Sequence, residues 1–252
     1  MNMLRLSLKS TYSPQAIVKA RFQGIGKTIL YVFLLSMIAA LPNVYHTNNH
    51  FTEAMDGLQT DLKDLPDFSI TDGSLHTNTK KAIESQTNGY AVVLDPKNSY
   101  EMKQIKDKQN AVGFLKEKLV IVINGQDIEV PYTEFNEEIT QQDILSLIDQ
   151  MKTIIFPVLS IFILLASTAG KFIAVTCLAL IGLFIRYRLK KNLSYKHLWV
   201  MSAYSITLAT VFFFMMDTLQ VAVFKGFLLY WLVNIVMLFL AIKETPHHKE
   251  QG

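Results

Sequence analysis

The stretch that decides the fold covers residues 154–185 and reads IIFPVLSIFILLASTAGKFIAVTCLALIGLFI. Its 32 residues include a single charged side chain, Lys171. As one continuous helix it would be about 48 Å long, which exceeds the roughly 30 Å hydrocarbon core of a bilayer. The pattern predicts a membrane-spanning helix, and its length leaves open either one long crossing or two short ones.

The loop that follows favours one crossing. Residues 186–197 contain five lysines and arginines and no acid. Cytoplasmic loops carry this excess of positive charge. If the amino terminus is inside, one crossing returns the loop to the inside, whereas two crossings would place it outside. We therefore expect one long helix over residues 153–185, tilted or kinked at Pro157, and a cytoplasmic loop over residues 186–197.

Three further apolar segments are predicted to cross the membrane, over residues 28–45, 198–216 and 226–242. A basic segment of residues 1–27 without acids precedes the first, and we read it as an interfacial amphipathic piece broken at Pro14. A cleaved signal peptide is the alternative for residues 28–45. The long leader and the poor small-x-small cleavage site at residues 38–40 favour an uncleaved anchor, with Pro42 bending or ending its helix. The tail, residues 243–252, returns to the cytoplasm.

The polar side chains of the last two predicted spans are expected to join helices by hydrogen bonds rather than to line a pore. They are Tyr204, Ser205, Thr207, Thr210 and Asn234.

Residues 46–152 differ completely from these segments. They hold 18 acidic residues against 10 lysines, a net charge of −8. An acidic block between two basic inner segments is expected outside the membrane. An acidic surface also argues against binding nucleic acid, because phosphates would be repelled.

This block is predicted to be a small α+β domain with a mostly antiparallel sheet. Strands are expected at residues 68–71, 74–76, 90–94, 111–115, 119–123 and 126–132, with a helix over residues 51–63. Asp72-Gly73 and Asn124-Gly125 are typical of type I′ hairpin turns. In the last strand, Ile128 and Val130 are expected to point into the core.

A second helix of the domain is expected to begin after Thr140. Thr140 and Asp143 resemble a capping box, and apolar residues follow at helical spacing. No turn signal separates this helix from the apolar stretch at residue 154. We therefore expect it to continue into the membrane and to couple the outer domain rigidly to the bilayer.

The fold class predicted is a membrane protein with four transmembrane helices and a small extracytoplasmic α+β domain between helices 1 and 2. Lys171 is the candidate functional or pairing residue within the membrane, because a cation in a span must snorkel, pair or line a wet cavity. Cys177, the one cysteine, is read as a small hydrophobe. No catalytic, cofactor-binding or metal-ligating residues are predicted.

Two motifs resemble a nucleotide-binding or a metal-binding site but lack the residues that such a site requires. Residues 24–28, GIGKT, resemble the end of a phosphate-binding loop, but the glycine required five residues before Gly26 is Arg21. The histidines His247 and His248 form no tetrahedral site by themselves, and His76 is expected to be structural.

Five short sequence segments, taken together, carry a resemblance to a known family: residues 65–68 with 72–73, 93–96, 114–121, 189–196 and 240–243. They resemble a family of bacterial four-helix membrane proteins common in Gram-positive bacteria, some of them labelled maltodextrin-utilisation protein. The membrane half is also similar to Yip-type membrane proteins. The resemblance implies an envelope accessory protein linked to sugar uptake, and it brings no catalytic residues.

Three functional hypotheses are consistent with the sequence. The leading hypothesis is a non-enzymatic accessory, sensor or assembly protein, embedded in the lipid bilayer, whose outer domain binds a membrane or envelope protein. The second is a small transporter or channel subunit, motivated by Lys171 and the polar third span. The third is a membrane enzyme that acts on lipid or cell-wall polymer through its outer carboxylates.

Overall fold

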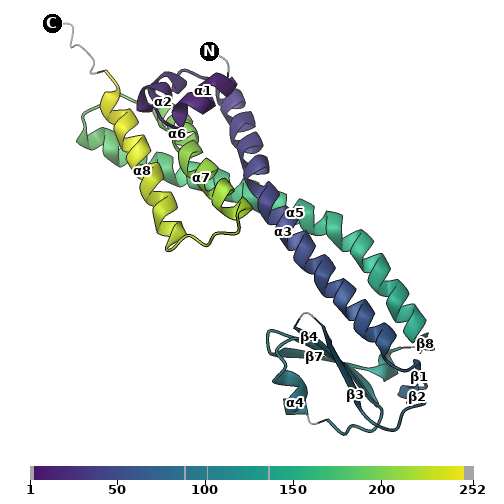
Figure 1. The fold of residues 1–252 in the computed structure, drawn as a ribbon. Helices are drawn as coiled ribbons and strands as arrows, with labels where there is room; N and C mark the ends of the chain where they lie inside the picture. Colours follow the sequence, from purple (N-terminus) through teal and green to yellow (C-terminus); the bar gives the residue numbers. More distant parts are fainter. Residues whose placement is uncertain (1–2, 88, 101, 136, 247–252) are drawn as a thin grey trace, which may run out of the picture. The chain divides into compact units, whose positions relative to one another are not determined.

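The computed structural model describes residues 3–87, 89–100, 102–135 and 137–246 (Figure 1). It contains two compact units. Unit 1 comprises Met1–His46 and Leu159–Gly252, and unit 2 comprises Thr47–Val158. The chain enters unit 2 within helix α3 (Ile25–Asp64) and leaves it within helix α5 (Gln141–Arg188), so these two helices are its only covalent connections to unit 1.

Four helices of the described chain are long and apolar enough to cross a membrane. They are α3, α5, the run formed by α6 (Tyr195–Ser205) and α7 (Thr207–Thr218), and α8 (Gly226–Glu244). A sheet region lies between the first and the second of them along the chain. The predicted succession of four apolar helices with an inserted sheet is therefore confirmed.

The helices expected separately over residues 28–45 and 51–63 are parts of one continuous helix, α3. Pro42, which was expected to bend or end its helix, lies inside α3 and does not end it. Pro157 lies inside α5, which continues past it. A proline removes only one backbone hydrogen bond, so a helix with otherwise intact neighbours can continue through it. The third span is interrupted at Ile206, where the Thr207 hydroxyl donates to the Tyr204 carbonyl, a bond that bends helices.

The amino-terminal residues form two short helices, α1 (Met3–Ser10) and α2 (Pro14–Ala20). The expected break is present, and Pro14 occupies the first position of α2, where its missing N–H costs nothing. α2 packs against α6 and α8, and Ile17 and Ala20 are fully buried. The basic segment therefore contributes to the core of unit 1.

Close helix packing in unit 1 depends on Gly182 of α5. A Cβ atom added there would lie 3.2 Å from Leu238 Cδ2 and 3.4 Å from Leu198 Cδ2. Without a side chain at residue 182, the backbone of α5 can approach α6 and α8 closely. By contrast, a Cβ atom at Gly170 would meet nothing within 4 Å.

Shared hydroxyl groups also join the helices of unit 1, as expected for Thr207. Its Oγ1 lies 2.6 Å from the Tyr31 hydroxyl and accepts a 3.2 Å hydrogen bond from Ser10. The Tyr31 ring stacks on Tyr204 with centroids 4.5 Å apart, and Ser36 shares a 2.9 Å hydrogen bond with Thr168.

Unit 2 contains a five-stranded and a three-stranded sheet. The larger has the order β3 (Ile83–Thr87), β4 (Tyr90–Asp95), β5 (Ala111–Leu115), β6 (Lys118–Ile123), β7 (Gln126–Pro131). The smaller has the order β2 (Ser74–Thr77), β1 (Phe68–Thr71), β8 (Ile139–Thr140). Every pairing is antiparallel except β4 with β5.

Both predicted hairpin turns are present. Asp72 and Gly73 have φ values of 51° and 71° between β1 and β2, and Asn124 and Gly125 have 51° and 77° between β6 and β7. Two successive positive φ values define the type I′ turn, and its twist matches that of the flanking strands.

The strands β3 and β8 were not predicted, and neither was the parallel pair. β4 and β5 run in the same direction because helix α4 (Met102–Lys106) lies in the connection between them. The expectation for Ile128 is wrong, since its side chain is 57% exposed. β7 is the edge strand, and the hydrophobic cluster on that face ends before it reaches Ile128.

The two faces of the large sheet bury different clusters. Val92, Leu94 and Phe114 pack on one face with Leu62 of α3 and Ile148 of α5. On the other face α4 inserts Ile105 over Gly113, where an added Cβ would lie 3.4 Å from Ile105. The end of α3 and the start of α5 are therefore part of the core of unit 2 (Figure 1).

Candidate functional site

A pocket of about 680 Å³ lies in unit 2 where the small sheet meets the start of α5. Its lining is mostly uncharged and polar: Asp67, Phe68, Ser69, His76, Thr77, Asn78, Thr140, Gln141 and Gln142. Hydroxyl, amide and imidazole groups of this kind orient a ligand through hydrogen bonds. His76, which was expected to be structural, is one of the exposed side chains of this pocket.

Strand alternation presents these polar groups. Ile70 faces the core together with Leu75, and both are buried. Their neighbours Ser69 and His76 are paired across β1 and β2, and therefore point to the opposite face. Thr140 of β8 pairs with Ser69 on that same face.

Gln141 connects the pocket to both helices. It is the first residue of α5 and is buried, with 8% of its surface exposed. Its Nε2 donates to the carbonyls of Leu62 and Leu65, at the carboxyl end of α3, the second at 3.4 Å. The side chain thereby adds a donor to the Leu62 carbonyl, which also accepts from the Leu65 N–H at 3.3 Å. It also supplies a donor to the Leu65 carbonyl just after the helix end.

The predicted capping box at the start of α5 is present. The Asp143 carboxylate accepts from the Thr140 N–H at 2.9 Å and from the Thr140 hydroxyl at 2.6 Å, and the Thr140 hydroxyl accepts from the Asp143 N–H at 3.2 Å. The Thr140 hydroxyl and N–H hold the pKa of Asp143 below its usual value. The turn of α5 that borders the pocket is thus fixed by local hydrogen bonds.

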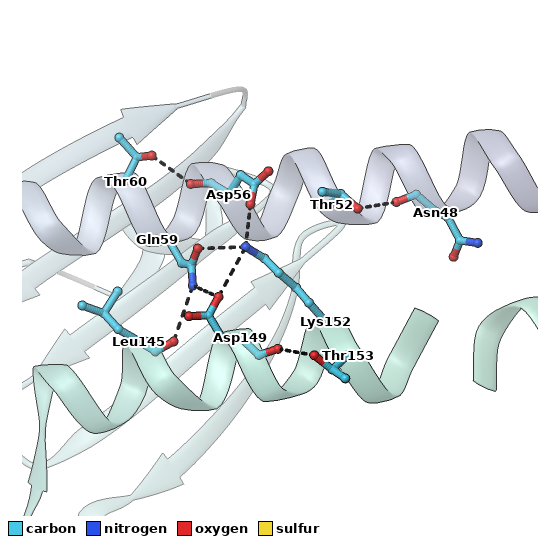
Figure 2. A network of polar contacts seen from close by, with 9 residues as sticks. All are labelled: Asn48, Thr52, Asp56, Gln59, Thr60, Leu145, Asp149, Lys152 and Thr153. Atoms are coloured by element: carbon cyan, nitrogen blue, oxygen red, sulfur yellow. Dashed lines mark hydrogen bonds and ion pairs between the residues drawn. The ribbon is translucent and has the colours of Figure 1, made fainter. Parts of the chain in front are cut away.

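A polar cluster joins α3 to α5 further along unit 2, and Figure 2 shows it from close by. The Lys152 ammonium lies 2.5 Å from Asp56 Oδ1 and 2.8 Å from Gln59 Oε1. Gln59 Nε2 donates to Asp149 Oδ1 at 2.7 Å, and the Lys152 side chain is only 18% exposed. A network of this kind fixes two helices in one register more strongly than an isolated surface pair does.

Asp61 ties α3 to the large sheet. Its carboxylate is fully buried, and Oδ1 accepts from the Ser85 and Thr87 hydroxyls of β3, each at 2.6 Å. Oδ2 has no hydrogen-bond partner within the described chain. A buried carboxylate requires such donors, which explains why the polar strand β3 lies beside this helix.

Lys171, the candidate from the sequence, belongs to unit 1. Its ammonium donates to Thr210 Oγ1 of α7 at 3.1 Å and to the Tyr230 hydroxyl of α8 at 3.2 Å. It also lies 4.6 Å from the centroid of the Tyr230 ring. Lys171 therefore links three helices through hydroxyl groups and a cation–π contact, and a functional role for it stays a prediction.

The residues of the pocket could not be selected from the sequence. Gln141 of the pocket, like Asp61 beside the large sheet, is a single polar residue, and the partners of these two residues lie 24 to 79 positions away along the chain. His247 and His248 lie outside the described residues. Within the described part of the chain, no three His, Cys, Asp or Glu side chains are grouped closely enough to hold a metal ion.

Together, the four helices and the sheet-bearing unit between the first two define a class, a protein with four helices long and apolar enough to cross a membrane and one inserted α+β unit. The chain belongs to the family described as "Protein of unknown function (DUF1189)", whose model matches residues 6–242. No curated protein and no solved structure matches the chain. The similarities to maltodextrin-utilisation and Yip-type proteins stay predictions.

Proposed function

We propose that the protein is a non-enzymatic accessory or sensor protein of the cell envelope. In this proposal it crosses the cell membrane four times with both termini inside, and residues 46–152 lie outside. The pocket of unit 2 binds a segment of a membrane or envelope protein, and α3 and α5 pass the bound state to unit 1.

The charge distribution supports this topology. Residues 1–52 contain no acid, and the loop between α5 and α6 is basic. The Arg186 guanidinium donates to the Leu193 carbonyl, and the Lys191 ammonium donates to the Thr245 carbonyl. The Arg186 bond fixes the basic loop to the end of α5, and the Lys191 bond fixes it to the end of α8. The positive-inside rule assigns such a loop to the cytoplasm.

The position of Gln141 supports the proposal that binding in the pocket of unit 2 acts on α3 and α5. It lines the pocket, begins α5 and bonds to the end of α3. The chain connects unit 2 to the rest of the protein through those two helices alone. A ligand that moves the Thr140–Gln141–Gln142 segment would therefore act directly on both connections.

An extended peptide is the occupant that best suits this pocket. The lining includes residues of β2 and of the two-residue strand β8, which lie at the two edges of the small sheet. The Leu75 N–H of β2 already donates to the Lys116 carbonyl at 2.8 Å, so in this proposal the peptide pairs with β8. Extended segments of partner proteins bind sheet edges through main-chain hydrogen bonds, and neighbouring side chains give specificity. A link to sugar uptake enters this proposal only through the family resemblance.

A photo-crosslinking amino acid at Asn78 tests the proposal in living cells. Asn78 is exposed and lines the pocket, whereas Lys97 is exposed in the turn after β4 and does not line it. We expect a discrete cross-linked protein with the probe at position 78 and none at position 97. The same products from both positions, or no product from position 78, would contradict a partner at this pocket.

A further inference from the structure

A second pocket, in unit 1, is lined in part by positively charged side chains. It encloses about 670 Å³ and is lined by Leu6 of α1, Lys19 of α2, residues of the turn between α2 and α3, and the first residues of α3. The full lining is Leu6, Lys19, Phe22, Gln23, Gly24, Gly26 and Lys27. We propose that this pocket binds the headgroup of an anionic phospholipid, an inference that rests on the proposed membrane location.

The charges of the pocket are positive and uncompensated. Lys19 and Lys27 are exposed, and no carboxylate among the described residues forms an ion pair with either. The first acid of the chain is Glu53, which belongs to unit 2. Two lysines with no acidic partner attract a phosphate group, and each contributes on the order of 1 kcal/mol next to an anionic surface.

A third cation adjoins the pocket. The Arg21 guanidinium lies 4.5 Å from the centroid of the Phe22 ring, and Phe22 is part of the lining. The Nη1 of Arg21 is buried and has no hydrogen-bond partner within the described chain. An unsatisfied guanidinium nitrogen is costly, and an oxygen-rich ligand would satisfy it.

The two glycines of the lining keep the pocket open. A Cβ atom added at Gly24 or at Gly26 would meet nothing within 4 Å. The space beside the lysines is therefore not taken up by side chains, and Gln23 is held to one wall by the Tyr204 hydroxyl, which donates to its Oε1. A headgroup can enter without moving the backbone.

Exposed apolar residues beside the pocket distinguish a lipid from a soluble phosphate ester. Phe22 is 74% exposed, and Ile25 and Ile29 of α3 are 41% and 44% exposed. Such side chains would lie along acyl chains when a phosphate occupies the pocket. A soluble phosphate ester has no acyl chains to contact them.

The test is a titration of fluorescent short-chain phosphatidylglycerol into the purified full-length protein in a neutral detergent. We expect saturable binding, and a Kd raised about tenfold or more in Lys19→Gln/Lys27→Gln. Gly26→Leu fills the pocket but keeps both lysines, and should weaken binding to a similar extent. Lys190→Gln/Lys196→Gln removes the same charge at exposed positions outside the pocket, and should change Kd less than about twofold.

Each control can overturn the inference. Unchanged binding in the Lys19/Lys27 or the Gly26 variant, or an equal loss in the Lys190/Lys196 variant, contradicts a specific site. Equal binding of short-chain phosphatidylcholine, or equal competition by glycerol 3-phosphate, contradicts an anionic lipid. Release of the wild-type protein from membranes by alkaline carbonate contradicts the proposed membrane location itself, so the two failures are distinguishable.

Discussion

Gln141→Leu is expected to lower the melting temperature of the full-length protein in detergent by about 10 °C. The substitution keeps the volume of the side chain but removes the donor to the Leu62 and Leu65 carbonyls. The Leu65 carbonyl would lose its side-chain donor, whereas the Leu62 carbonyl would keep the Leu65 N–H. Leaving a buried carbonyl without a donor costs about 1–3 kcal/mol, and each kcal/mol lowers the melting temperature of a domain of this size by about 4–8 °C.

Gln142→Leu is the matched control, because Gln142 is adjacent, lines the same pocket and is exposed. It should change stability by less than about 0.5 kcal/mol. Hydrogen exchange should show faster exchange at both the end of α3 and the start of α5 in Gln141→Leu. If the two leucine variants melt alike, Gln141 does not hold the two helices together.

Gly182→Leu should destabilise unit 1 by about 3 kcal/mol. The Cβ atom alone would lie 3.2 Å from Leu238 Cδ2, and the rest of a leucine would push α5 away from α6 and α8. Gly182→Ala requires only a small shift of Leu238, so it should be much milder. The readout is the melting temperature of the full-length protein, together with hydrogen exchange in α6 and α8.

Gly170→Leu controls for the loss of glycine from the same helix. It adds its side chain to open space, so no clash opposes the gain in helix propensity of about 1 kcal/mol. We expect its melting temperature to equal or exceed that of the wild type. A Gly170 variant as unstable as the Gly182 variant would contradict the close packing of α5 on α6 and α8.

The features of the fold that could be predicted from the sequence are those encoded locally. Asp72-Gly73 and Asn124-Gly125 indicated their turns because few residue pairs adopt two positive φ values. Uninterrupted apolar runs indicated the four long helices, and Thr140 with Asp143 indicated the start of α5.

The structural features that the sequence did not predict depend on contacts between residues far apart along the chain. β3 has the sequence IESQT and lies beside Asp61. Because most of its residues are polar, the sequence shows no apolar strand pattern there. Ile128 alternates like a core residue, but its place in the edge strand leaves it exposed. Gln141 and its pocket depend on contacts between residues nearly 80 positions apart, which no spacing within one helix reveals.

The most direct test of the account is the location of unit 2. In a Cys177→Ser background, single cysteines replace Lys80 in unit 2 and Asn192 in the basic loop, both of which are exposed. A membrane-impermeant maleimide should label position 80 in intact cells, and position 192 only after the cells are permeabilised. Labelling of position 192 but not of position 80 in intact cells would place the sheet-bearing unit in the cytosol and contradict the account.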